Sequence, residues 1–295
     1  EQTFSYYQAS KVLHITNNEV SGGAARSVMR LHSALQDINM DSKLLLLNKE
    51  SDDESALAYY SSRFSVLSKL RSFMDRLPSI FYFRSNHPSK FSFAWLPDRV
   101  TKRINKINPD VVHIHWINNG QMSLGTLDKI KQPVVLTMLD MWPITGGCHY
   151  DYGCHGYTRS CGACPVLGST WKRDFSSFQL KKKKDIFSNK NIELIAISNW
   201  LKDCADASYA VSGNAVKVIP PALDTKIYRP MDKATCREIF GLPQKKYLIL
   251  FGAMNATSDP RKGVSELSAA LKILVSRLGS EKIEAVVFGE SLDGL

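Results

Sequence analysis

The sequence contains no run of eighteen or more apolar residues, which excludes a membrane-spanning helix on sequence grounds. Its first ten residues, EQTFSYYQAS, lack the basic start and apolar centre of a signal peptide. We therefore expect a cytoplasmic protein. With 295 residues, of which 44% are hydrophobic, the chain is long enough for one large or two medium domains.

Two common nucleotide-binding signatures are also missing. Gly22 and Gly23 lie between a predicted strand (11–16) and a predicted helix (24–38), but without GxGxxG spacing or a phosphate-binding lysine. No acidic residue ends the next predicted strand, 43–48. These absences disfavour a nicotinamide oxidoreductase and ATP hydrolysis. Backbone amides at such a turn still suit a phosphate or another oxygen-rich ligand, although a simple tight turn is the alternative.

Cysteine is scarce, yet four of the six cysteines lie close together: Cys148, Cys154, Cys161 and Cys164. Disulfides are disfavoured in a reducing compartment, where clustered thiols more often bind metal. We expect a closed, structural four-thiolate zinc site, with His149 and His155 as substitute ligands. Buried free thiols or a redox-labile pair are the alternatives. Cys204 and Cys236 fall in predicted helices and are expected to pack as small core residues.

The net charge of +10 is concentrated in residues 61–107, which hold ten Lys or Arg against Asp75 and Asp98. A helical projection of residues 64–77 places its apolar side chains opposite its basic ones. The aromatic residues Phe81, Tyr82 and Phe83 follow. This segment suits an anionic membrane surface, and the alternative is a helix docked on its own domain with a solvated basic face. We also expect Lys181 to Lys184 to form a solvated helix face.

Short apolar runs alternate with longer segments of helical periodicity, which is typical of doubly wound α/β domains. The first series contains four or five parallel strands, with runs at 11–16, 43–48, 110–116, 133–138 and 192–198. A second series has strands at 247–253 and 284–289 with a helix at 264–278. We expect a Rossmann-like domain at 1–222, a linker at 223–246 and an incomplete, truncated second domain at 247–295.

The turn of the second series joins a strand to a helix and places Arg261 and Lys262 directly before Gly263. Two cations at a helix start can neutralise a diphosphate that becomes a leaving group. An ordinary basic turn is the alternative, but the helix dipole disfavours it.

Several segments occur together in one order: GGAARSVMRLH, PDVVHIHW, DMWPITGGCHY with its cysteines, ISNWL, VIPPALDTKIYRP and LFGAMNATSDPRKG. In this combination the chain resembles bacterial glycosyltransferases of family 4, and most of all the branch that makes capsular and colanic-acid-type exopolysaccharides. The resemblance extends over nearly the whole chain from about residue 11. It covers several distinct motifs, so it is more specific than any one of them.

The resemblance implies a GT-B fold, in which two Rossmann-like domains face each other across a cleft. It implies retaining transfer of a sugar, of hexosyltransferase type, from a nucleoside diphosphate sugar to a glycan or lipid-linked acceptor, with no metal ion in the chemistry. By position, Gly22 and Gly23 would lie beside the donor diphosphate, and Lys262 with Arg261 would bind it. Such a reaction needs cationic stabilisation of the leaving group and accurate placement of the acceptor hydroxyl.

Two departures from the family pattern stand out. Relatives carry His in the T-x-H-D turn after the fourth strand, whereas this chain has Leu139, which forms no hydrogen bond through its side chain. The acidic E-x7-E region that grips the donor sugar would follow residue 295. We therefore expect the isolated chain to bind sugar nucleotide weakly and to be inactive.

Five residues at predicted strand ends are candidates for contact with the acceptor, namely His115, Trp116, Asp140, Trp142 and Asn199. We expect Asp140 and Lys262 to contribute most to catalysis. His14 and His113 lie inside strands and are expected to pack in the core. The main alternative is a non-catalytic zinc-bearing module on a membrane or RNA, but no nucleic-acid reader motif occurs, so no nucleic-acid partner is expected.

Overall fold

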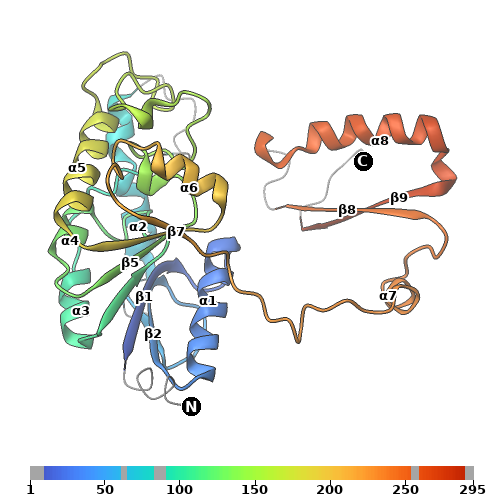
Figure 1. Ribbon diagram of the computed structural model, residues 1–295, viewed down its shortest axis with the longest axis horizontal. Helices are drawn as coiled ribbons and strands as arrows, with labels where there is room; N and C mark the ends of the chain where they lie inside the picture. Colours follow the sequence, from blue (N-terminus) through green and yellow to red (C-terminus); the bar gives the residue numbers. More distant parts are fainter. Residues whose placement is uncertain (1–9, 61–64, 83–90, 254–258, 290–295) are drawn as a thin grey trace. The chain divides into compact units, whose positions relative to one another are not determined.

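The computed structural model describes residues 10–60, 65–82, 91–253 and 259–289. It divides into two compact units, Glu1–Leu223 and Asp224–Leu295 (Figure 1). Each unit is described by itself. Within the basic segment 61–107, Arg63, Phe83, Arg84 and Lys90 lie outside the described residues. No helix among the described residues is long and apolar enough to cross a membrane.

The first unit is built on one parallel sheet of seven strands in the order β3-β2-β1-β4-β5-β6-β7. The strands are β1 (Lys11–Asn18), β2 (Asp41–Asn48), β3 (Ala56–Ala58), β4 (Val111–Ile114), β5 (Val134–Met138), β6 (Ile192–Ala196) and β7 (Val216–Val218). β1 and β2 carry nearly continuous buried side chains, as a parallel sheet covered on both faces requires. The predicted α/β fold is confirmed.

The sheet has seven strands where four or five were expected. The two that the sequence did not reveal, β3 and β7, are three residues long and lie at the two edges of the sheet. Three residues are too few for any apolar periodicity to show. β4 is also shorter than predicted and ends at Ile114, so His115 and Trp116 lie in the loop beyond it.

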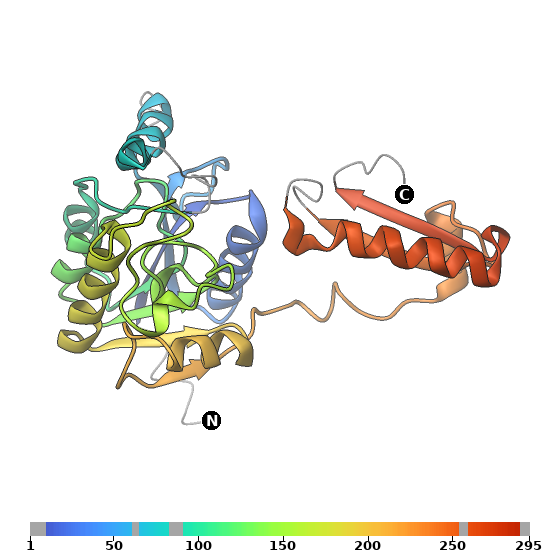
Figure 2. The same cartoon turned by 90° about the horizontal axis from the view of Figure 1, so that it is seen from above.

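Helices cover both faces of this sheet. They are α1 (Gly22–Asp37), α2 (Ser65–Asp75), α3 (Val100–Ile107), α4 (Leu124–Lys129), α5 (Phe175–Asn189) and α6 (Asn199–Asp206). In both views α3, α4 and α5 lie together on one face and α1 lies on the other (Figures 1 and 2). Ser123, Asp174 and Ser198 cap α4, α5 and α6, because their side chains accept amide hydrogen bonds there.

The connection from β5 to α5 is long and contains only two short 3-10 turns, η4 (Trp142–Ile144) and η5 (Gly156–Thr158). It includes the predicted cysteine-rich insertion at 146–168. Close backbone packing holds it: a Cβ on Gly162 would lie 2.0 Å from the Lys172 carbonyl oxygen. The Cys164 amide donates to Asp174 Oδ2 at 2.9 Å, which ties the end of the loop to the cap of α5.

The second unit contains α7 (Lys233–Ile239), β8 (Tyr247–Ala253), η6 (Pro260–Lys262), α8 (Val264–Leu278), η7 (Ser280–Lys282) and β9 (Ile283–Gly289). β8 and β9 pair in parallel, with Tyr247 opposite Ile283. This is the βαβ arrangement that the periodicity predicts. The segment expected to be a linker, 223–246, contains α7, which Asp232 caps by accepting from the Thr235 amide.

Candidate functional site

A carboxylate that is only 12% exposed, Asp140, lies two residues beyond the end of β5 and accepts three hydrogen bonds. Its Oδ2 accepts from Trp116 Nε1 at 2.9 Å and from His149 Nδ1 at 2.7 Å, and its Oδ1 accepts from the Trp142 amide at 2.8 Å. Burial alone would raise the pKa of Asp140, but the neighbouring His149 and these hydrogen bonds lower that pKa below its usual value. Asp140 is therefore an ionised anchor for three segments of the chain.

His149 continues this network to Ser92. Its Nε2 lies 2.9 Å from Ser92 Oγ, and its ring stacks on Trp116 with centroids 5.6 Å apart. A carboxylate only accepts, so His149 Nδ1 donates to Asp140, while Nε2 lies within hydrogen-bond distance of the Ser92 hydroxyl. Both ring nitrogens are thus engaged within the protein rather than offered to the cysteines. Leu139, which stands where the family pattern has a histidine, is half-buried. The imidazole that contacts Asp140 in this chain belongs to His149.

The structure places Trp142 inside the domain, with 3% of its surface exposed. Its Nε1 donates to the Ser92 carbonyl at 3.1 Å, and Lys183 Nζ lies 3.9 Å from the centroid of its ring. Lys183 is fully buried and donates to the carbonyls of Trp142 and Thr145. The predicted solvated face at 181–184 is therefore wrong at Lys183, which lies on the core side of α5. Burial lowers the pKa of Lys183 to about 7.

His115 is also buried and belongs to a cluster with His14 and His113. Its Nε2 lies 3.0 Å from His14 Nδ1, while His113 Nε2 lies 2.8 Å from Thr137 Oγ1. Burial lowers the pKa of His14 to about 3 and that of His113 to about 4, so these imidazoles are neutral. Their ligand nitrogens lie within 4.8 Å of one another, which is compatible with a metal ion. The prediction of core packing holds for His14, which is 0% exposed.

Gly22 and Gly23, predicted to precede the helix, are the first two residues of α1, directly after the turn that follows β1. Gly22 has a φ of +94°, and a Cβ on Gly22 or Gly23 would meet nothing within 4 Å. The capping residue Ser21 makes no side-chain hydrogen bond to the first turn of α1. The first amides of this helix are therefore not satisfied by its cap, in an open position suited to an anion.

Asn199 begins α6 directly after the capping residue Ser198, whose Oγ accepts from the Leu201 amide at 3.2 Å. The next residue, Trp200, is 56% exposed. This turn and the Asp140 turn both follow neighbouring parallel strands, β6 and β5, so they lie at the same carboxyl edge of the sheet.

In the second unit, Arg261 and Lys262 lie on η6 directly before α8. Arg261 Nε donates to Asp259 Oδ1 at 2.8 Å, and its Nη2 donates to Oδ2 at 2.6 Å, so this guanidinium is held within its own turn. Lys262 is exposed, and no ion pair involves it among the described residues. Gly263 has a φ of +73° between the turn and the helix, which favours glycine at this position.

The four clustered cysteines are free thiols and line one small cavity of about 20 Å³. That volume is enough for one water-sized occupant. Burial raises the pKa of Cys161 to about 12 and also raises the pKa of Cys148 and Cys164, so these thiols are protonated in the absence of a cation. His155 is mostly exposed and pairs with Asp151 at 3.0 Å rather than with a thiol.

No protein-family model matches the chain. The chain is 27% identical over 191 residues to a D-inositol 3-phosphate glycosyltransferase of Nocardioides sp., an alignment covering 63% of this chain and 36% of the relative. It is 30% identical over 70 residues to a provisionally named colanic acid biosynthesis glycosyl transferase, WcaC, of Escherichia coli K12. That alignment covers 21% of this chain and 17% of the relative. The chain thus matches only a minor part of the length of either relative.

Two solved structures have a similar fold. One is a glycosyltransferase from Rickettsia africae, with a TM-score of 0.51 and 14% identity, covering 96% of this chain and 69% of that one. The other is WaaG, a glycosyltransferase involved in lipopolysaccharide biosynthesis, with a TM-score of 0.51 and 14% identity, covering 94% and 62%. Such low identity shows the fold alone. The chain has an α/β fold that matches GT-B glycosyltransferases, as the sequence predicts.

Proposed function

We propose that this chain contributes to a retaining glycosyltransferase of family 4 and hexosyltransferase type. It would move a sugar from a nucleoside diphosphate sugar to a glycan or lipid-linked acceptor in bacterial surface polysaccharide synthesis. The observation that carries this proposal is the similarity over 191 residues to a relative named as a glycosyltransferase. The shorter match to WcaC favours the exopolysaccharide branch.

For the donor, we assign a diphosphate-binding role separately to the amides at Gly22 and Gly23 in the first unit and to the ammonium of Lys262 in the second unit. The uncapped start of α1 and the exposure of Lys262 support this assignment. Arg261 would act mainly by shaping its turn, since Asp259 engages its guanidinium on two nitrogens. As the bond to the anomeric carbon breaks, negative charge grows on the departing diphosphate, and fixed amides or a fixed cation would stabilise that charge.

For the acceptor, we assign the carboxyl edge of the sheet around Trp116, His149 and Asn199. Asp140 already accepts three hydrogen bonds from the protein, so its role there would be to orient Trp116 and His149. Trp142 and His115 would support this surface from below, because both are buried. Accurate placement of the acceptor hydroxyl is the other requirement of a transfer with little acid-base chemistry.

A structural zinc ion at the four cysteines is a separate part of the proposal. The convergence of the four thiols on one small cavity supports it. Among the described residues, the three ligand atoms that lie within 4.8 Å of one another belong to His14, His113 and His115 and not to the cysteines. The cysteine sulfur atoms would therefore have to move closer together to bind one zinc ion. Zinc would order the long insertion beside the acceptor surface and take no part in the transfer.

Attachment to an anionic membrane is supported by α2 and the turn after it, η2 (Leu77–Phe81). Leu70, Phe73 and Met74 of α2 are 48%, 65% and 37% exposed, and Phe81 of η2 is 74% exposed. Apolar side chains exposed beside the basic residues of this segment fit a peripheral site on the inner face of a plasma membrane.

A thermal-shift screen with UDP- and GDP-sugars tests the donor site. A sugar nucleotide that binds should raise Tm, and Lys262→Ala should weaken its apparent affinity about tenfold, since one charge-assisted contact is lost. Lys272→Ala, which removes an exposed lysine of α8 in the same unit, is the matched control. Equal shifts in both variants would remove the assignment of Lys262, and the absence of any stabilising sugar nucleotide would contradict the function.

A further inference from the structure

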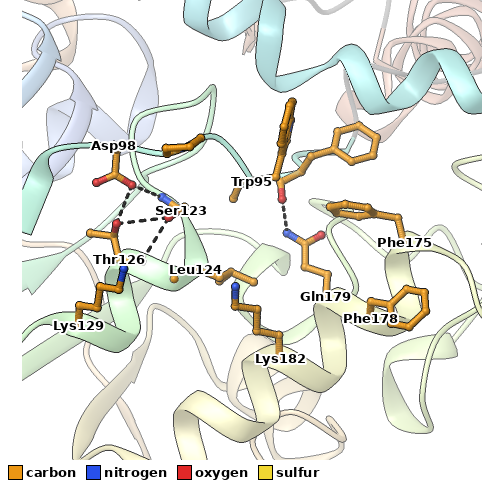
Figure 3. A pocket seen from close by; sticks show the side chains of 14 residues that line it. Trp95, Asp98, Ser123, Leu124, Thr126, Lys129, Phe175, Phe178, Gln179 and Lys182 are labelled. Carbon is orange, nitrogen blue, oxygen red and sulfur yellow. Dashed lines mark hydrogen bonds between the residues drawn. The ribbon is translucent and has the colours of Figure 1, made fainter.

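A hollow of about 510 Å³ lies on the first unit, between residues 93–98, the start of α4 and the start of α5 (Figure 3). None of the residues assigned above to the donor, the acceptor or the metal lines it. The hollow is therefore a separate feature of the domain. Its size lies in the range of sites that enclose small organic ligands.

Trp95 forms one wall of the hollow, and the backbone directly before it is strained. Ala94 before it has a φ of +46°, a left-handed conformation that is uncommon for residues other than glycine. The backbone amides of Phe93, Ala94 and Trp95 lie near the buried carboxylate of Asp75 and act to lower its pKa, which burial raises, and the Asp75 carbonyl accepts from Trp95 Nε1 at 3.2 Å. Strained backbone conformations of this kind cluster at ligand-binding and other functional segments.

Despite this support, the Trp95 side chain remains open to the hollow and is 44% exposed. Phe178 on α5 lines it as well and is 62% exposed. Behind them Phe93 and Phe175 pack with ring centroids 4.9 Å apart, which fixes the buried backing of the hollow. Rigid aromatic faces that stay in contact with water are suited to stacking against a ligand.

The charge at the hollow is positive. Lys129 of α4 and Lys182 of α5 line it, and neither belongs to an ion pair among the described residues. The carboxylate in the described lining, Asp98, is engaged on both oxygens: Oδ1 accepts from the Val100 amide at 3.0 Å, and Oδ2 accepts from Thr126 Oγ1 at 2.7 Å. Two ammonium groups are thus left to attract an anion.

We propose that this hollow binds a saccharide that carries a negative charge, with sugar faces on Trp95 and Phe178 and the anionic group between Lys129 and Lys182. Aromatic faces alone would suit a neutral sugar and the lysines alone a simple anion, whereas their combination selects an acidic saccharide. The inference rests on the proposed function in one respect, which is that the saccharide would be the acceptor or growing product of the transferase.

The test measures binding to the 295-residue chain by titration calorimetry, without any sugar nucleotide, so its outcome does not depend on the donor site or on turnover. The probes are a glucuronate-containing hyaluronan tetrasaccharide, neutral maltotetraose and inorganic phosphate. We expect the acidic tetrasaccharide to bind at least about tenfold more tightly than the other two. Equal binding of maltotetraose or of phosphate would overturn the proposal.

Variants locate the site. Lys129→Gln with Lys182→Gln should weaken binding of the acidic tetrasaccharide at least about tenfold, and Phe178→Ala should weaken it independently. Lys106→Gln with Lys181→Gln removes the same charge from exposed positions on α3 and α5 that do not line the hollow. This control should bind as the unmodified chain does. An equal loss in the control would assign the binding to general electrostatics and overturn the proposal.

Discussion

His149 Nδ1 lies 2.7 Å from Asp140 Oδ2, and this contact joins the end of β5 to the long insertion that follows it. The same oxygen accepts from Trp116, which follows β4. One carboxylate thus organises two strand ends and a loop at the carboxyl edge of the sheet, where α/β proteins build their ligand sites. Its removal should therefore affect both stability and the shape of this surface.

Asp140→Asn should lower the free energy of unfolding by about 2 to 4 kcal/mol. The amide keeps the shape of the side chain, but its NH2 group would face a donor where the carboxylate oxygen now accepts. Urea denaturation followed by tryptophan fluorescence measures the change, because Trp116 donates to this carboxylate.

The matched control for this change is Asp151→Asn. Asp151 also contacts an imidazole, His155, at 3.0 Å, but that histidine is 70% exposed. A contact to a side chain this exposed contributes at most about 1 kcal/mol, so this variant should lose less stability than Asp140→Asn does. Similar losses in both variants would show that the network around Asp140 adds nothing beyond a surface ion pair.

The buried histidines predict that stability falls as the solution becomes acidic. Burial lowers the pKa of His14 to about 3 and that of His113 to about 4 in the folded protein, whereas both should titrate near 6.5 when unfolded. Below pH about 6.5 the unfolded chain therefore binds protons that the folded protein cannot. Between pH about 6.5 and about 4, the free energy of unfolding should therefore fall by up to about 1.4 kcal/mol per pH unit for each histidine.

Urea unfolding at a series of pH values measures this slope. His14→Gln should make the slope between pH about 6.5 and 4 less steep, because one buried titrating group is gone. A stability that stays constant between pH about 6.5 and 5 in the unmodified protein would contradict the burial of these imidazoles.

How far the sequence predicts this fold depends on the length of each element. The strands β1, β2, β5 and β8 have five to eight residues each and contain apolar runs long enough to show in the sequence. Their alternation with segments of helical periodicity indicates parallel pairing. β3 and β7 have three residues each and gain their pairing only from the sheet they join. α7 has seven residues in a segment with prolines nearby, which conceals its periodicity.

The site was harder to predict, because its contacts link residues far apart in the chain. The position of Asp140 after a strand makes it a candidate, but Ser92 and His149 lie 57 residues apart and no local motif joins them. Burial was the other source of error. Lys183 lies in a run of four lysines that indicates solvent, and only the packing of α5 shows that this position faces the core.

Lys183→Ala should lower the free energy of unfolding by about 3 kcal/mol. The change leaves a cavity under the Trp142 ring and removes the donor of the Trp142 and Thr145 carbonyls. Lys181→Ala removes a neighbouring, exposed lysine of the same helix and should stay within about 0.5 kcal/mol of the unmodified protein. Chemical denaturation of both variants checks the difference, and equal stability would contradict the burial of Lys183.

The cysteine cavity predicts a metal content. Protein purified with reduced thiols should carry about one equivalent of zinc, whereas less than about half an equivalent argues against a closed four-ligand site. Cys161→Ser should remove the metal, while Cys204→Ser, which changes a thiol of α6 outside the cavity, should retain it. Because burial raises the pKa of Cys148 and Cys161, zinc must displace protons to bind these thiols. Its affinity should therefore fall as the pH is lowered, and mass spectrometry under native conditions can follow that loss directly.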